Sequence, residues 1–228
     1  MADFSPIQLT NEFEQVSNSD WVALAEKALK GEPLESLVTT TVDGISIQPI
    51  YSASESIGRI TSPGSDEWDI RALVMSSGTD AANQIAHEEL MKGSTSLLID
   101  LFSIGSPNLE QILEGIYPEM TTISLHPNPY GFEAAEGLLE LWRSNNFSSC
   151  KGDLGLDPLG VSSRYGGETD WNGVVEATIS TQDHPDVHSI TVDSTVYAEA
   201  GASEAWELAC SLSTAAVSYT HLTLPTKA

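Results

Sequence analysis

Apolar and polar positions between residues 68 and 216 follow two periods in turn, and this alternation predicts five strand–helix units. Short apolar or β-branched runs predict strands at residues 68–75, 95–102, 121–125, 152–156 and 189–196. Apolar positions three and four residues apart predict helices at residues 80–91, 109–116, 131–143, 171–181 and 202–210. A long loop is expected at residues 162–169, and Gly201 is expected in the turn before the last helix. Because strands joined by helices run parallel through right-handed crossovers, the pattern predicts a parallel α/β sheet.

Two sheet architectures fit this order of elements. One is an open, doubly wound sheet, and the other is a (β/α)8 barrel that is cut short. No Gly-x-Gly-x-x-Gly motif follows any predicted strand, so the dinucleotide-binding form of the open sheet lacks its fingerprint. A complete barrel takes about 250 residues, and the part of the chain after residue 67 is shorter. The barrel alternative therefore predicts a truncated (β/α)8 barrel of five units.

The first 67 residues have a different pattern, which predicts an arm, a helix and a hairpin. Residues 1–18 carry scattered apolar positions and are expected to lie on another surface. A helix is predicted at residues 20–30, with Ser19 as its N-cap and Gly31 just past its end. Two β-prone runs, 37–41 and 45–51, flank Asp43-Gly44, which is typical of a type I′ hairpin turn. Residues 52–67 are rich in Ser, Gly and acidic residues and are expected to form a linker.

The last twelve residues, 217–228, abandon the helical and acidic character of the preceding chain. They resemble a translated sequencing adapter, and they are expected to be a non-native tail. The expected organisation is an N-terminal segment 1–67, a partial barrel 68–216 and a tail 217–228. On this hypothesis the natural protein continues past about residue 216 with three further barrel units.

Charge and cysteine content exclude several classes of function. The chain has 9 Lys and Arg against 33 Asp and Glu, a formal charge of −24 at pH 7. A nucleic acid or an anionic membrane would repel such a surface, so a partner is expected to be neutral or basic. The spacing of Cys150 and Cys210 fits no metal motif, and the N-terminus has no signal-peptide pattern. No apolar run reaches membrane-spanning length, and a cytoplasmic location is expected.

Two motifs resemble the B12-dependent acyl-CoA mutases, the methylmalonyl-CoA mutase family. The first is the strand-and-loop segment 190–202 with its Glu-Ala-Gly-Ala core at 199–202, and the second is the pair of segments 21–31 and 43–51. The resemblance covers roughly residues 17–215. It implies a (β/α)8 barrel with acyl-CoA threading its centre, and interconversion of succinyl-CoA and methylmalonyl-CoA by radicals from adenosylcobalamin. The Asp-x-His-x-x-Gly motif by which base-off cobalamin proteins ligate cobalt is absent.

The same resemblance implies that this chain has lost its active site. Arg71 matches the family's Trp-Thr-Ile-Arg-Gln-Tyr segment, but Leu73 replaces the substrate-facing tyrosine, Gly155 replaces a glutamine and Val196 replaces the active-site histidine. The family includes a noncatalytic small (β) subunit that pairs with a catalytic large subunit, and residues 157–160 resemble its loop after strand four. The resemblance therefore implies a small-subunit fragment without catalytic, cofactor-binding or metal residues, whose catalytic partner binds adenosylcobalamin and acyl-CoA.

Two alternatives remain open at this point. Asp100, Asp153, Asp157 and Asp193 fall near predicted strand ends, where barrel enzymes hold their catalytic groups, and they could bind a divalent cation. These carboxylates, or His126 as a general base, could also serve a self-sufficient (β/α)8 enzyme. The competing interpretation is that strand-end aspartates cap the following helices. A catalytic mutase with an apolar acyl substrate is the other alternative, because Leu73 and Val196 would suit such a group.

Overall fold

The structure is a computed structural model that describes residues 16–51, 68–182 and 184–223. The chain divides into two compact units, Met1–Pro63 and Gly64–Ala228, which are treated separately below. Most of the expected arm 1–18 and the whole expected linker 52–67 lie outside the described residues.

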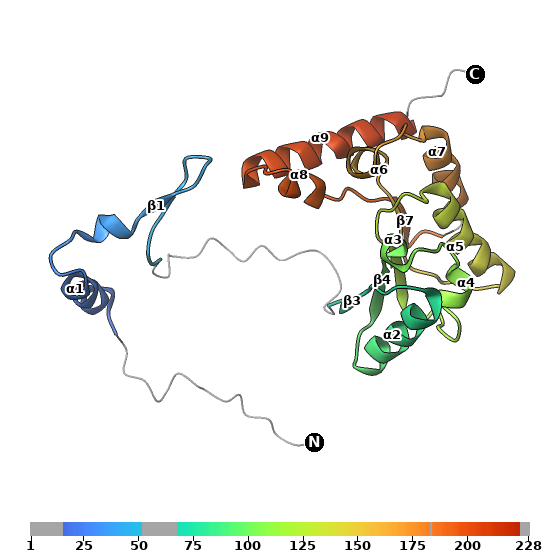
Figure 1. Cartoon of the computed structure of the whole chain (residues 1–228), viewed down its shortest axis with the longest axis horizontal. Coiled ribbons are helices and arrows are strands. Elements are labelled where there is room, and N and C mark those ends of the chain that lie inside the picture. The colour runs from blue at the N-terminus through green and yellow to red at the C-terminus, as the bar shows by residue number, and fades with distance from the viewer. Residues whose placement is uncertain (1–15, 52–67, 183, 224–228) are drawn as a thin grey trace. The chain divides into compact units, whose positions relative to one another are not determined.

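The N-terminal unit contains helix α1 (Asn18–Ala28), a 3-10 turn η1 (Leu34–Leu37) and a hairpin of β1 (Thr39–Thr40) and β2 (Ser46–Ile47) (Figure 1). Helix α1 begins two residues earlier than predicted, because Ser17 and not Ser19 is its N-cap. The Ser17 hydroxyl accepts the Asp20 N–H at 3.2 Å, and the Asp20 carboxylate accepts the Ser17 N–H at 3.1 Å.

The predicted hairpin is confirmed, but its turn is not of type I′. Thr41 N–H donates to Ile45 O at 2.9 Å, which leaves the three-residue loop 42–44. Gly44 has a φ of +79°, and Asp43 does not have a positive φ. A three-residue hairpin loop needs one left-handed residue at its end, where a type I′ turn needs two. None of the described residues of this unit is buried.

The C-terminal unit is built on five parallel strands in the order β3-β4-β5-β6-β7. They are β3 (Arg71–Val74), β4 (Ser96–Ile99), β5 (Thr122–Leu125), β6 (Gly152–Leu156) and β7 (Val187–Ile190). All five predicted strands are thus present. A doubly wound sheet reverses its order at a switch point, and this sheet keeps chain order throughout. The fold is α/β with the sequential parallel sheet of a partial (β/α)8 barrel.

Helices cover one face of this sheet (Figure 1). They are α2 (Thr79–Met91), α4 (Leu109–Ile112), α5 (Phe132–Ser144) and α7 (Trp171–Ser180), close to the ranges predicted, although α4 is shorter. Trp142 of α5 is fully buried, together with Leu97 and Ile123 of the strands. The opposite face of β3 is open, because Arg71 is exposed and Leu73 is 48% exposed. The core therefore lies between the sheet and the helices.

Two predicted element types are wrong near the strand ends. Helix α3 (Leu101–Ile104) occupies the end of the predicted strand 95–102, because the Asp100 carboxylate accepts the N–H groups of Phe102 and Ser103 and starts a helix. Helix α6 (Pro158–Tyr165) occupies the start of the predicted loop 162–169. Asp157 caps it, and proline is favourable at a first helical position.

The strand predicted at residues 189–196 is wrong in both bounds, because β7 runs over Val187–Ile190. Helix α8 (Thr195–Glu199) follows, and Gly201 with a φ of +92° lies in the turn before α9 (Glu204–Thr223). Helix α9 passes through residue 217 without a break, contrary to the pattern expected there. His221 stacks on Trp171 at 4.0 Å between ring centroids, and Ser218 is buried. Residues 224–228 lie outside the described residues. Within the described ranges, no helix combines the length and hydropathy needed to cross a bilayer.

Candidate functional site

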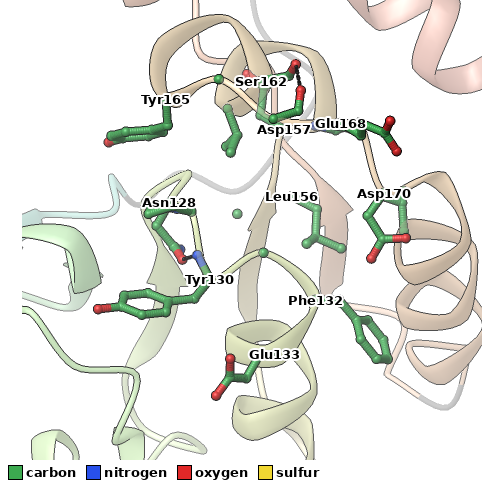
Figure 2. A pocket seen from close by; sticks show the side chains of 18 residues that line it. Asn128, Tyr130, Phe132, Glu133, Leu156, Asp157, Ser162, Tyr165, Glu168 and Asp170 are labelled. Carbon is green, nitrogen blue, oxygen red and sulfur yellow. Dashed lines mark hydrogen bonds between the residues drawn. The ribbon is translucent and has the colours of Figure 1, made fainter.

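A cavity of about 470 Å³ lies at the carboxyl ends of β5 and β6 (Figure 2). Its walls come from residues 128–133 after β5, from residues 155–170 in and after β6, and from Val174 of α7. Strand β6 has an irregular register between Asp153 and Leu156, and Gly155 there has a φ of +67°. In (β/α)8 barrels the carboxyl ends of the strands carry the ligand sites, so this cavity is the candidate site.

Asp157 links two loops at the wall of this cavity through hydrogen bonds. The side chain is 2% exposed, and its two oxygens accept the Gly160 N–H at 2.9 Å and the Asp193 N–H at 2.8 Å. Burial raises the pKa of this carboxyl, while the two hydrogen bonds act in the opposite direction. Asp157 therefore caps α6 and ties the loop after β6 to the loop after β7.

The other strand-end aspartates also have local partners. Asp100 caps α3, and Asp193 accepts the N–H and the hydroxyl of Thr195 at 3.0 and 2.6 Å. Asp153 lies within β6 and not at its carboxyl end. Within the described ranges, no group of three or more His, Cys, Asp or Glu could hold a metal ion. Of the four aspartates proposed as a carboxylate cluster, only Asp157 and Asp193 lie together, and their contact is a hydrogen bond from the Asp193 backbone to the Asp157 carboxylate.

His126 lies directly after β5 and is half-buried. Its Nδ1 is 3.0 Å from the carbonyl oxygen of Pro127, and the Asn128 amide donates to the His126 carbonyl at 2.8 Å. No carboxylate of the described chain orients this imidazole. A general base must lie within hydrogen-bond reach of the proton that it removes, and the contacts of His126 are with the backbone of its own loop.

A polar network missed by the sequence analysis lies on the open face of the sheet. Asp153 of β6 pairs with Arg71 of β3 at 3.2 Å and accepts the Ser124 hydroxyl at 2.7 Å. The second oxygen of Asp153 is 3.2 Å from His188 Nδ1, and Arg71 Nε donates to Ser96 at 2.9 Å. The sequence pattern that could have predicted this network is the polar residues at alternate positions of otherwise apolar strands. Alternate positions of a strand lie on the same face of a sheet.

The Arg71–Asp153 contact bridges two intervening strands. Three strand spacings of about 4.8 Å would separate β3 and β6 by roughly 14 Å in a flat sheet. The 3.2 Å contact therefore needs the long Arg71 side chain to extend across β4 and β5, and curvature of the sheet, as in a barrel, would shorten that distance. The network lies on the face of the sheet that the helices α2, α4, α5 and α7 do not cover.

The three positions compared with mutase active sites lie on three different elements. Leu73 is on the open face of β3, Gly155 is in the irregular part of β6, and Val196 is half-buried in α8 beside Asp157 and Arg164. A Cβ atom at residue 155 would lie 2.3 Å from the Leu125 carbonyl oxygen, so only glycine fits this backbone. None of the three residues offers a polar side chain.

No protein-family model matches the chain. Two curated proteins are similar to it, and both are called methylmalonyl-CoA mutase small subunit. The protein from Streptomyces virginiae is 31% identical over 238 aligned positions, which cover 91% of this chain and 38% of the relative. The protein from Propionibacterium freudenreichii subsp. shermanii is 28% identical over 246 positions, which cover 94% and 39%. The chain thus spans about two fifths of the length of these relatives. With the sequential parallel sheet, these matches show that the chain belongs to the methylmalonyl-CoA mutase family, among its small subunits.

Proposed function

We propose that the chain is a structural part of an adenosylcobalamin-dependent methylmalonyl-CoA mutase, which interconverts succinyl-CoA and methylmalonyl-CoA, and that it has no catalytic activity of its own. Both relatives are named as small subunits, which supports pairing with a larger subunit. In this proposal the catalytic large subunit is the partner in a heterodimer, and the complex is expected in the cytoplasm.

The observation that carries the proposal is the set of side chains at residues 73, 155 and 196. Leu73, Gly155 and Val196 cannot donate a hydrogen bond to a carboxylate or a thioester carbonyl. At Gly155 the backbone itself prevents a glutamine, because a Cβ atom would meet the Leu125 carbonyl. A bound acyl-CoA would therefore keep desolvated polar groups without partners, which is costly.

Arg71 is the residue that agrees with the mutase motif, and its guanidinium already has partners within this chain. Its guanidinium contacts Asp153 at 3.2 Å, Asp69 at 3.5 Å and the Ser96 hydroxyl at 2.9 Å. A substrate carboxylate would have to displace two aspartates of the same charge. This arrangement supports a structural role for Arg71 in this chain.

The N-terminal unit supports association with a partner. None of its described residues is buried, and Leu24, Val42 and Ile45 are 64%, 94% and 62% exposed. A segment that buries nothing within itself does not form a stable domain alone. The capped helix and the hairpin are therefore proposed to lie against the large subunit.

Adenosylcobalamin is expected to be bound by the catalytic partner, and when bound it supplies the radical chemistry of the reaction. The cavity at the strand ends of this chain has no histidine among its lining residues. These residues therefore do not fit a cobalt-ligating role.

Co-expression with a catalytic mutase subunit tests the proposal. We expect the chain to co-purify with that subunit, and we expect mutase activity to require the large subunit and to be absent from this chain alone. Leu24→Asp should weaken co-purification, whereas Glu26→Gln on the same helix should leave it unchanged. Turnover of an acyl-CoA by this chain alone would refute the noncatalytic role.

A further inference from the structure

The cavity at the carboxyl ends of β5 and β6 has the size and lining of a small-molecule site. Its volume of about 470 Å³ lies in the range of ligand pockets. Three aromatic rings contribute to the walls, Tyr130, Phe132 and Tyr165, together with Leu156. Figure 2 shows Tyr130 and Tyr165 on one side of the cavity and Glu168 with Asp170 on the other. The aromatic and the acidic parts of the lining therefore lie on opposite sides of the cavity.

The lining carries negative charge without a counter-ion. Glu133, Asp157, Glu168 and Asp170 line the cavity, and the lining includes no Lys, Arg or His. Asp157 is satisfied by two N–H groups, and Asp170 accepts the Gly173 N–H at 2.9 Å. Glu133 and Glu168 are exposed, and within the described ranges their carboxylates have no hydrogen-bond or ion-pair partner.

The amino ends of α5, α6 and α7 at this cavity offset part of that charge. Each helix terminus contributes roughly half a positive charge, and the cavity has four carboxylates, so an excess of negative charge remains. Arg164, on α6, is engaged with Glu199 at 3.1 Å and Asp193 at 3.7 Å. An anionic ligand such as the phosphates of coenzyme A would be repelled here.

We propose that this cavity binds a small organic cation, an ammonium or guanidinium group carried on an apolar body. The carboxylates of Glu133 and Glu168 attract the charge, and the rings of Tyr130 and Tyr165, across the cavity from Glu168, accept the apolar body. This ligand class differs from the acyl-CoA of the proposed reaction, and the site does not depend on the proposed role of the chain. The two proposals can therefore fail separately.

Three probes of one shape test the ligand class: benzylamine, which is cationic, benzyl alcohol, which is neutral, and benzoate, which is anionic. Binding to the full chain is measured by isothermal titration calorimetry and by saturation-transfer NMR at low salt. We expect benzylamine to bind at least about fivefold more tightly than benzyl alcohol, and benzoate to show no binding. Equal binding of the three probes, or no binding of benzylamine, overturns the proposal.

Variants locate the binding. Glu168→Gln should weaken benzylamine binding about fivefold and leave benzyl alcohol unchanged, because it removes charge and keeps shape. Glu133→Gln is a second variant with the same expectation. Glu140→Gln, an exposed residue of α5 outside the cavity lining, is the matched control. These glutamates are exposed, so the variants should fold, and an affinity equal to that of the Glu140→Gln variant in both cases would refute the site.

Discussion

Placing at residue 155 the glutamine that the resemblance to catalytic mutase subunits implies should destabilise the local structure instead of creating a substrate contact. Gly155 has a φ of +67°, and a side chain in this left-handed region costs about 1–2 kcal/mol. A Cβ atom there would also lie 2.3 Å from the Leu125 carbonyl oxygen and 2.8 Å from its carbon. These are backbone atoms of β5, the strand next to β6, so relief requires that the sheet shifts, at about 1–3 kcal/mol. We expect Gly155→Ala and Gly155→Gln to lower the free energy of unfolding by about 2–5 kcal/mol.

Urea unfolding followed by tryptophan fluorescence measures this effect, because Trp142 is fully buried in the same unit. Gly105→Ala is the matched control. Gly105 has a similar φ of +76°, but a Cβ atom there would have no neighbour within 4 Å. The control should cost only the backbone term of about 1–2 kcal/mol. If both alanine variants lose the same stability, the steric argument is wrong, and the absence of a glutamine would have to be explained by function alone.

Three further predictions concern the same unit. Asp157→Ala should lower the free energy of unfolding by about 2–4 kcal/mol in a urea titration, because it leaves two N–H groups without acceptors; a loss under 1 kcal/mol would show that water replaces the carboxylate. Burial raises the pKa of the Cys150 thiol to about 11, so at pH 8 iodoacetamide should modify Cys210 first. Cys150 should react only after unfolding, and mass spectrometry measures the labelling of each cysteine. Equal labelling rates in the folded chain would contradict that burial. Arg71→Met should cost less than about 1 kcal/mol, because the side chains of Arg71 and Asp153 are 39% and 24% exposed. The cost should shrink in 0.5 M NaCl, and a loss that is insensitive to salt would argue against an electrostatic contribution.

Much of the barrel-like fold could be predicted from the sequence, because strand and helix periods differ and the segments are well separated by turn residues. The elements missed were short ones. Residues 101–104 continue the apolar run of β4, and only the cap at Asp100 distinguishes a helical turn from more strand. Helix α6 begins with Pro158 and contains Gly160, and these residue types usually indicate a loop. An aspartate followed by proline, as at Asp157, is also typical of the start of a helix.

The candidate site was less predictable, because it depends on contacts between distant residues. The sequence placed four aspartates near strand ends but could not show that Asp157 accepts an N–H of Asp193 from the next loop. It also placed Val196 at a strand end, whereas β7 stops at Ile190 and Val196 lies in α8. The Arg71–Asp153 pair joins strands that are separated by two others, which no local pattern encodes.

The strand order β3-β4-β5-β6-β7 has a consequence for how the chain is made. Each strand pairs with the strand synthesised immediately before it. During translation, every new strand can therefore pair with the edge of a sheet that has already formed. Contacts of this kind close short loops, which favours rapid, stepwise folding during translation. Each intermediate also exposes the unpaired edge of its newest strand until the next unit emerges, and a chaperone or a neighbouring chain could bind there.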